Sequence, residues 1–213
     1  MSGVTGIVLC GGHSRRMGRP KAWLPFGDEY LLQRVVRIVG EAVGNVIVVA
    51  AKGQSIPPLP DFARRVDDLI DDRGPMGGLA TGLKAVQSEC ETVYLSACDG
   101  PLLTPEFIKR ICSAFTPNDL AVVLFTDKFH PLNAVYRTSI LPFVERRLAE
   151  GLLRMQELFN EIPHRKLFAS DFADIDPDLE SVRNINAMDD YTSALNDYNL
   201  QHGKHTLFRT ASG

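Results

Sequence analysis

A basic, glycine-containing segment near the start of the chain has the residue types that bind phosphate. In residues 7–21, IVLCGGHSRRMGRPK, a run of β-forming residues leads into a glycine pair and then a cluster of cations. Adjacent glycines let the backbone turn tightly and present N–H groups to an anion. Arginine and lysine add charge that matches phosphate oxygens. We therefore predict a phosphate-binding loop, with a capped surface turn as the alternative, formed by Gly11, Gly12, Arg15, Arg16, Arg19 and Lys21.

The glycine spacing in this segment does not match two common nucleotide-binding motifs. A P-loop requires GxxxxGK followed by Ser or Thr, and a dinucleotide fingerprint requires GxGxxG. Neither pattern occurs in residues 7–21. The missing fingerprint argues against an NAD-dependent oxidoreductase.

Asp99 is an acidic residue at the end of a second apolar run, in the segment YLSACDGPLL. A carboxylate in such a place can hold Mg²⁺ while water and substrate phosphates fill the other coordination positions. The alternative is an aspartate that caps a turn, as Asp-Gly pairs commonly do. A basic loop and an acidic residue at neighbouring strand ends are better explained together, as a site for a metal-bound phosphate chain.

A third polar segment, DDLIDDRGPMGG, covers residues 67–78 and contains Asp67, Asp68, Asp71 and Asp72. One of these carboxylates could accept hydrogen bonds from the edge of a nucleobase or support the metal. The alternative for most of them is a solvated charged loop. The residues after them, 73–75, predict a turn.

The elements that must position these residues alternate between strands and helices. Apolar, β-branched runs predict buried strands over residues 5–10, 46–50, 92–97 and 120–125. Helical spacing of apolar residues predicts helices over 31–39 and 107–115, the second begun by Thr104, Pro105 and Glu106. This order predicts an α/β fold with a mainly parallel sheet and helices on both faces. Ligands of such sheets bind at the carboxyl ends of the strands, where all three polar segments fall.

The second half of the chain is less regular. Residues 130–136 predict a strand, residues 139–150 a helical stretch, and a last helix begins near Met188 with Asn186 and Asp189 as its cap. Residues 52–60, KGQSIPPLP, predict an extended surface connection. We expect one domain over residues 1–200 and a frayed polar tail over 201–213.

Composition narrows the class of protein. The 213 residues carry a formal net charge of −3, which argues against nucleic acid or an anionic membrane as a partner. The four cysteines have neither zinc-site nor disulfide-framework spacing, which favours free thiols in a reducing compartment. The first residues lack the pattern of a signal peptide, and no apolar run reaches membrane-spanning length. We therefore expect a cytoplasmic protein.

Taken together, the segments resemble the molybdenum cofactor guanylyltransferase family. The opening signature of that family, LxGGxSxRMGxxK, is matched without a gap by Leu9, Gly11, Gly12, Ser14, Arg16, Met17, Gly18 and Lys21. DDLIDDRGPMGGLATGL is similar to its segment ending in GPLxG, LSACDGPLL to its CDxP segment, HPLNAVY to HPLxxxY, and VRNINAMDDY to NxNTPED. The resemblance extends over roughly residues 4–195.

The resemblance implies a Rossmann-like nucleotidyltransferase fold and transfer of GMP from Mg²⁺-bound GTP to molybdopterin-bound molybdenum, with release of pyrophosphate. It implies that Lys21 and Arg16 neutralise the phosphates and that Asp99 holds Mg²⁺. Asp68 would contact GTP, with Asp67 as the alternative through a shift of one residue. Backbone groups would line the nucleotide at Leu9, Cys10, Gly11 and Gly12, and the metal or the pterin phosphate would face Asn184 and Asn186.

The chemistry implied by the resemblance is an in-line displacement by a phosphate oxygen. Such a nucleophile is already ionised at neutral pH, so we assign no general base to His13 or His130. Cys98 and Cys10 are interpreted as small buried hydrophobic residues. GTP and the molybdenum cofactor are the expected partners, together with molybdoenzymes or their chaperones.

Two positions depart from the family pattern. A polar residue expected after the second strand is replaced by Ala50 and Ala51, and Thr-Pro of the last motif is replaced by Ala187 and Met188. Transfer of CMP or of another nucleotide to a phosphorylated acceptor is one alternative. A non-catalytic nucleotide-binding partner of molybdoenzymes is another.

Overall fold

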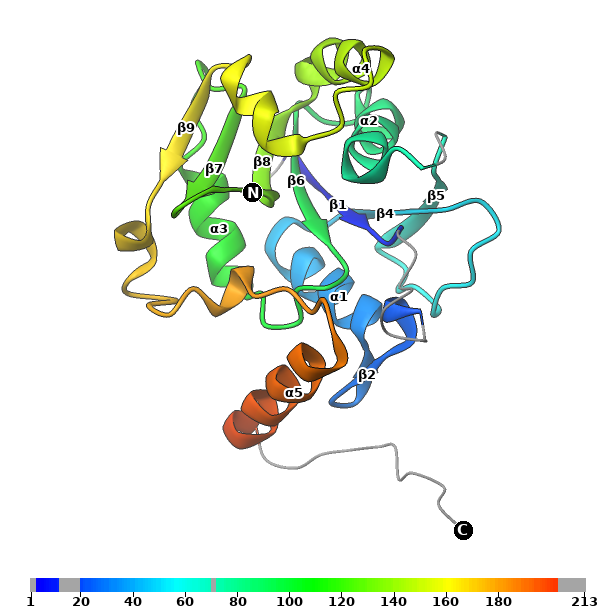
Figure 1. Cartoon of the computed structure of the whole chain (residues 1–213), viewed down its shortest axis with the longest axis vertical. Helices are drawn as coiled ribbons and strands as arrows, with labels where there is room; N and C mark the ends of the chain where they lie inside the picture. The colour runs from blue at the N-terminus through cyan, green and yellow to red at the C-terminus, as the bar shows by residue number, and fades with distance from the viewer. Residues whose placement is uncertain (1–2, 12–19, 70–71, 203–213) are drawn as a thin grey trace.

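A mixed seven-stranded sheet runs through the molecule in the order β5-β4-β1-β6-β8-β7-β9. The computed structural model describes residues 3–11, 20–69 and 72–202 (Figure 1). The strands are β1 (Val4–Leu9), β4 (Val46–Ala50), β5 (Ala63–Asp67), β6 (Thr92–Ala97), β7 (Ala121–Phe125), β8 (Phe129–Arg137) and β9 (His164–Leu167).

Strand direction brings the polar segments to one edge of this sheet. β5, β4, β1 and β6 are parallel to one another, and β9 is parallel to β7. β8, the strand expected over residues 130–136, runs antiparallel to both β6 and β7. The expected α/β fold with a mainly parallel sheet is confirmed. The carboxyl ends of β5, β4, β1 and β6 therefore lie side by side.

Helices cover both faces of the sheet. α1 (Leu31–Val43) and α3 (Pro105–Ser113) pack with one apolar cluster, and α2 (Gly74–Val86) and α4 (Leu141–Ala149) pack with the other (Figure 1). The side chain of Thr104 accepts a hydrogen bond of 3.2 Å from the Phe107 N–H, so the predicted start of α3 is confirmed. The 3-10 helices are η1 (Lys21–Trp23), η2 (Thr138–Ile140), η3 (Met155–Asn160), η4 (Ala169–Phe172) and η5 (Glu180–Val182).

Helix α2 begins at Gly74, where the sequence pattern predicts a turn. Glycine is a poor helix former, but two glycines of α2 are required by close packing on β1. A Cβ at Gly78 would lie 2.9 Å from Leu9 Cδ2, and one at Gly82 would lie 2.8 Å from Ile7 Cδ1. The glycines thus let the helix approach the strand that leads into the basic loop. β5 and β9 were also not expected, because both are short and rich in charged residues.

The C-terminal helix α5 (Met188–His202) packs against a small hairpin near the start of the chain. The hairpin consists of β2 (Pro25–Phe26) and β3 (Glu29–Tyr30), and α5 lies beside it in Figure 1. Phe26 is fully buried, and its ring contacts those of Tyr191 and Tyr198. Gly27 adopts φ +64°, and a Cβ there would lie 2.8 Å from the Tyr198 ring. The hairpin and the C-terminal helix are therefore joined through an apolar contact.

The start of α5 differs from its expected cap. Asp190, rather than Asp189, accepts the backbone N–H groups of Asn186 and Ala187, at 2.8 and 2.9 Å. These bonds lower the pKa of Asp190. The loop before the helix points its N–H groups at the later aspartate, which the spacing alone does not reveal. The helix includes residues 201 and 202 of the expected tail, and residues 203–213 lie outside the described part.

Within residues 3–11, 20–69 and 72–202, no helix is both long enough and apolar enough to cross a membrane.

Candidate active site

Two charged residues meet at the carboxyl edge of the sheet, where the sequence predicts a phosphate and metal site. Lys21 lies on η1, and Asp99 follows the end of β6. Lys21 Nζ lies 3.0 Å from Asp99 Oδ2, and each side chain is 19% exposed. The structure thus brings the expected phosphate-binding cation and the expected metal ligand into direct contact.

The carboxylate of Asp99 has one oxygen that is suited to a further ligand. Oδ2 accepts the hydrogen bond from Lys21. Oδ1 is buried and has no hydrogen-bond partner among the described residues. Leaving a charged oxygen without a partner costs free energy, so an arriving cation would be stabilised there. The described part of the chain contains no group of three acidic, cysteine or histidine side chains that could hold a metal.

A segment from the far end of the sequence lies along Asp99. The backbone N–H of Ile185 donates a hydrogen bond of 2.8 Å to the Asp99 carbonyl oxygen. Asn184 is half-buried, and its Oδ1 would lie 3.7 Å from a Cβ placed on Gly100. Asn186 is exposed, and its backbone N–H is used by Asp190. Of the two expected asparagines, Asn184 is therefore placed beside the CDGP turn and Asn186 at the start of α5.

The aspartates of the second polar segment lie at the other side of this edge. Asp67 ends β5, is exposed and accepts a hydrogen bond of 2.8 Å from Arg65 Nε. Asp68 is half-buried and accepts one of 2.7 Å from the Thr81 hydroxyl. Thr81 lies on α2 and also accepts the Leu69 N–H at 3.2 Å. Asp68 is thus held against the helix, whereas Asp67 is paired on the surface.

Gln54 links the residues that follow β1 and β4 through hydrogen bonds. Its Nε2 donates to the Cys10 carbonyl oxygen at 2.8 Å, and its Oε1 accepts the Ala51 N–H at 3.0 Å. Arg65 holds the backbone of this loop by donating to Gln54 O and Ala51 O, at 2.6 and 2.9 Å. Sequence reasoning missed these contacts because Gln54 lies in a proline-rich connection that carries no motif.

Some backbone groups of the residues that we expect to line the nucleotide are hydrogen-bonded to neighbouring strands of the sheet. The Leu9 carbonyl oxygen accepts the Cys98 N–H at 3.0 Å, and the Cys10 N–H donates to Val49 O at 2.8 Å. Gly11 is exposed, and a Cβ placed on it would meet no atom of the described residues within 4 Å.

Two buried thiols, those of Cys10 and Cys98, lie at the carboxyl ends of β1 and β6. A hydrogen bond from the Cys98 thiol lowers the pKa of Cys10, and the charge of Arg65 acts in the same direction, against the effect of burial. The same contact and burial raise the pKa of Cys98 well above its ordinary value. At neutral pH Cys98 is therefore a thiol, in agreement with its interpretation as a small buried residue.

Part of the expected site lies outside the described residues. This part includes Arg16, which we expect to neutralise phosphates, and Gly12, which we expect to line the nucleotide. The others are His13, Ser14, Arg15, Met17, Gly18 and Arg19, and Asp71 of the second polar segment.

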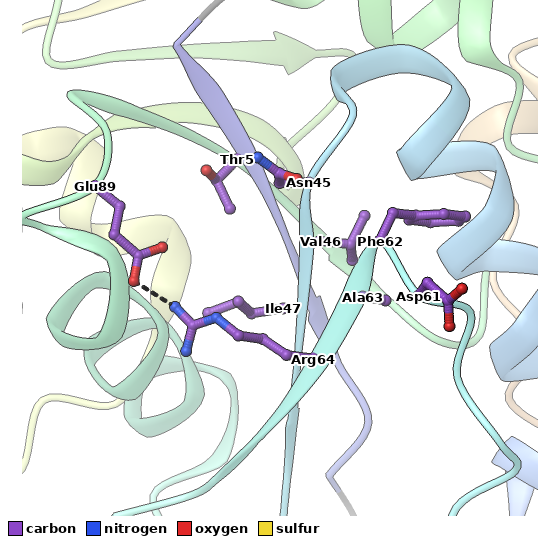
Figure 2. Close-up of a pocket in the computed structure, with 9 residues that line it drawn as sticks. All are labelled: Thr5, Asn45, Val46, Ile47, Asp61, Phe62, Ala63, Arg64 and Glu89. Carbon is purple, nitrogen blue, oxygen red and sulfur yellow. Dashed lines mark hydrogen bonds and ion pairs between the residues drawn. The ribbon is translucent and has the colours of Figure 1, made fainter.

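A cavity of about 290 Å³ lies at the opposite edge of the sheet. Figure 2 shows it between the starts of β1, β4 and β5, with Phe62 on one side and the ion pair of Arg64 and Glu89 on the other. Ligands of α/β sheets bind at the carboxyl ends of the strands. The cavity is thus separate from Lys21 and Asp99.

Comparison with known proteins agrees with this geometry. Residues 6–165 match the family described as MobA-like NTP transferase domain. A "Probable molybdenum cofactor guanylyltransferase" from Carboxydothermus hydrogenoformans is 30% identical over 205 residues, which cover 94% of this chain and all of the relative.

Solved structures share the fold. The crystal structure of molybdopterin-guanine dinucleotide biosynthesis protein A from Archaeoglobus fulgidus superposes with a TM-score of 0.77 at 20% identity, covering 92% of this chain and 99% of that one. The structure of Rv0371C in complex with manganese, from Mycobacterium tuberculosis, superposes with a TM-score of 0.61 at 18% identity, covering 92% of this chain and 99% of that one.

Proposed function

The chain belongs to the family of MobA-like NTP transferases, and we propose that it transfers GMP from GTP to the molybdenum cofactor. The products are the guanine dinucleotide form of the cofactor and pyrophosphate. The observation that carries this proposal is the contact of Lys21 with Asp99 at the carboxyl edge of the sheet. The name of the full-length relative from Carboxydothermus hydrogenoformans supplies the substrate class.

The chemical problem of this reaction is repulsion between negative charges. A phosphate oxygen of the acceptor must approach the α-phosphorus of GTP, and the leaving pyrophosphate carries charge away. Fixed positive groups lower this barrier because they interact most strongly with charge that develops in the transition state. Lys21 supplies one such group, and we assign a second to Arg16 from the resemblance.

Asp99 is the residue that we assign to Mg²⁺. Its buried Oδ1 lacks a hydrogen-bond partner in the described part of the chain, and hard divalent cations prefer carboxylate oxygens. A related fold has been solved in complex with manganese, which supports a divalent cation. When bound, such an ion neutralises phosphate charge and polarises the phosphorus–oxygen bonds.

The remaining assignments place the nucleotide along the edge from β5 to β6. We assign nucleotide contacts to Asp68 and to backbone groups at Leu9, Cys10, Gly11 and Gly12. Asn184 and Asn186 would face the metal or the acceptor phosphate. The position of Asn184 beside the turn that carries Asp99 supports its assignment.

We also assign this activity to the cytoplasm, with molybdoenzymes or their chaperones as recipients of the product. All four cysteines are free thiols, and a reducing compartment keeps thiols in that state.

The test is a pyrophosphate-release assay with molybdopterin-bound molybdenum as acceptor and Mg²⁺. We expect release with GTP, at least about tenfold slower release with CTP or ATP, and none without acceptor. Faster release with CTP would identify a cytidylyltransferase. GTP binding without any release would identify a non-catalytic binding protein. Omitting the acceptor controls for simple hydrolysis.

A further inference from the structure

We propose that Cys10 and Cys98 are a modification site, at which a small hydroperoxide converts the two thiols into a disulfide that reversibly disables the nucleotide site. The inference about the disulfide rests on the placement of the two cysteines. The inference about its effect rests on the proposed function.

The two cysteines occupy matching places on neighbouring parallel strands. β1 and β6 pair with Leu9 opposite Ala97, and the next residue of each chain is a cysteine. The Cys98 N–H donates to Leu9 O at 3.0 Å, so the pairing continues beyond the strand ends. Both side chains therefore lie on the same face of the sheet, in the same apolar cluster.

This placement is compatible with the geometry of a disulfide. Neighbouring strands lie about 4.8 Å apart, which falls inside the Cα separation of about 4.4–6.8 Å found across disulfides. Both cysteines are the first residues past the ends of their strands, and their backbone N–H groups still donate to Val49 O and Leu9 O. Of the other two cysteines, Cys90 lies in the connection between α2 and β6, and Cys112 lies on α3.

We assign the first reaction to Cys10. Its side chain is buried, at 3% exposure, but the next residue, Gly11, is exposed at the edge of the sheet, and Gln54 Nε2 lies 3.7 Å from the Cys10 sulfur. The Cys10 sulfur attacks one peroxide oxygen, the oxygen–oxygen bond breaks, and the thiol proton passes to the leaving oxygen. The products are a sulfenic acid and an alcohol, or water when the oxidant is hydrogen peroxide. The Cys98 sulfur then attacks the Cys10 sulfur, the sulfur–oxygen bond breaks, and the Cys98 thiol proton leaves with that oxygen as water. Two thiols lose two electrons in total, and the peroxide gains them.

The consequence for the site follows from the neighbours of the two cysteines. Cys10 leads into the basic loop through Gly11, and Cys98 directly precedes Asp99. A covalent bond between the sulfurs would draw these two chain segments together and change the spacing between the loop and the carboxylate. A dithiol would restore the original state by thiol exchange.

The experiment treats the full chain with hydrogen peroxide, stops the reaction with catalase, and analyses free thiols and tryptic peptides. We expect the number of free thiols to fall from four to two, with one linked pair joining residues 1–15 to residues 85–109. Trypsin leaves Cys90 and Cys98 on the same peptide, so the Cys90→Ser variant assigns the partner. Cys112→Ser is the matched control, because this thiol is as buried as Cys98, at 7% exposure.

The link should persist in Cys90→Ser and Cys112→Ser and should be absent from Cys10→Ser and Cys98→Ser. Absence of the linked peptide from the wild-type chain, or a link to Cys90 or between two molecules, would overturn the proposal. The wild-type measurement decides this point even where a variant fails to fold.

A second measurement tests the effect on the site. Oxidation of the wild-type chain should weaken GTP binding by about tenfold or more, because the binding groups no longer keep their spacing, and dithiothreitol should restore it. Unchanged binding by a chain that carries the disulfide would overturn the proposed effect. If the reduced chain does not bind GTP, the proposed function fails, and the peptide analysis still decides whether the disulfide forms.

Discussion

The ion pair of Lys21 and Asp99 holds opposite charges 3.0 Å apart. In the proposed function, a metal-bound nucleotide would bring a phosphate to Lys21 and a cation to Asp99. Each side chain would then exchange its partner in the ion pair for a substrate group with the same sign of charge as that partner. This exchange reduces the cost of desolvating either charge when the nucleotide binds.

Replacing Asp99 by asparagine should separate binding from chemistry. We expect turnover to fall by at least about a hundredfold, because a bound metal supplies several kcal/mol of transition-state stabilisation and each 1.4 kcal/mol is tenfold. GTP should still bind through Lys21 and the loop. Pyrophosphate release and GTP titration measure the two effects. Asp61→Asn, at the opposite edge of the sheet, is the control, and near-normal Mg²⁺-dependent release by Asp99→Asn would show that the metal assignment is wrong.

Replacing Lys21 by alanine should lower both affinity and rate. A hydrogen bond from a charged group contributes about 1.5–3 kcal/mol, so we expect GTP to bind about tenfold to a hundredfold more weakly. The rate should fall as well, because the same cation stabilises charge in the transition state. Lys109→Ala, on the exposed face of α3, should change neither quantity. Equal effects of the two variants would mean that Lys21 acts only through overall charge.

At the scale of elements, the sequence predicts the buried strands and the amphipathic helices. It does not predict the elements that depend on their place in the sheet or on contacts with distant parts of the chain. β4 and β6 match their expected bounds. Every residue of β4 and most residues of β6 are buried, so each strand is a continuous apolar run that the sequence reveals. β5 is an edge strand with arginines, so its apolar pattern is weak. α2 is rich in glycine because of its contact with β1, and that contact is not visible in local sequence.

In the candidate site, too, the residues in motifs could be predicted and the contacts between distant segments could not. Lys21 and Asp99 could be predicted because each stands in a motif with a physical reason for its residue types. Their direct contact could not, since they are 78 residues apart and meet only through the order of strands. Gln54 and Thr81 were not predicted, because each acts through a hydrogen bond to a group distant in sequence.

Filling the space at Gly82 tests the close contact between α2 and β1. A Cβ there would lie 2.8 Å from both Cδ1 and Cγ2 of fully buried Ile7. We expect Gly82→Ala to lower the free energy of unfolding by about 1 kcal/mol, since overpacking costs about 1–3 kcal/mol and better helix propensity returns about 1. Urea titration measures the change. In an Ile7→Ala background the same substitution should cost less, and an equal cost in both backgrounds would contradict the packing argument.

At the scale of the whole molecule, Arg34 connects four parts of the chain. It lies on α1, is 9% exposed, and donates from Nε to Pro101 O at 2.6 Å. Its guanidinium lies 5.1 Å from the Phe26 ring centroid and 4.4 Å from that of Tyr198. The turn after Asp99, the N-terminal hairpin and the C-terminal helix are thereby held by one side chain.

Replacing Arg34 by leucine should therefore destabilise the chain and disturb Asp99 as well. A buried acceptor left without its donor costs about 1–3 kcal/mol, and we expect a loss of that size in the free energy of unfolding. Arg37→Leu is the matched control on the same helix. Its pair with Glu41 is exposed, and its pair with Glu29, an acceptor that Arg34 also contacts, is partly buried, with 43% of the Arg37 side chain exposed. We expect these pairs to contribute about 0–1 kcal/mol. Equal losses in urea titration would argue against a special role of Arg34.

The hydrogen bond from Ile185 to Asp99, together with the packing of α5 on the N-terminal hairpin, also bears on the order of events during synthesis. The ribosome makes the basic loop first and the strand that carries Asp99 halfway through. The segment that fixes the Asp99 turn is made only near the end. A nascent chain can thus build its sheet and cover most of it before the site acquires its final form. A chain that ends after residue 180 would lack both the hydrogen bond from Ile185 to Asp99 and the packing of Tyr191 and Tyr198 on Phe26.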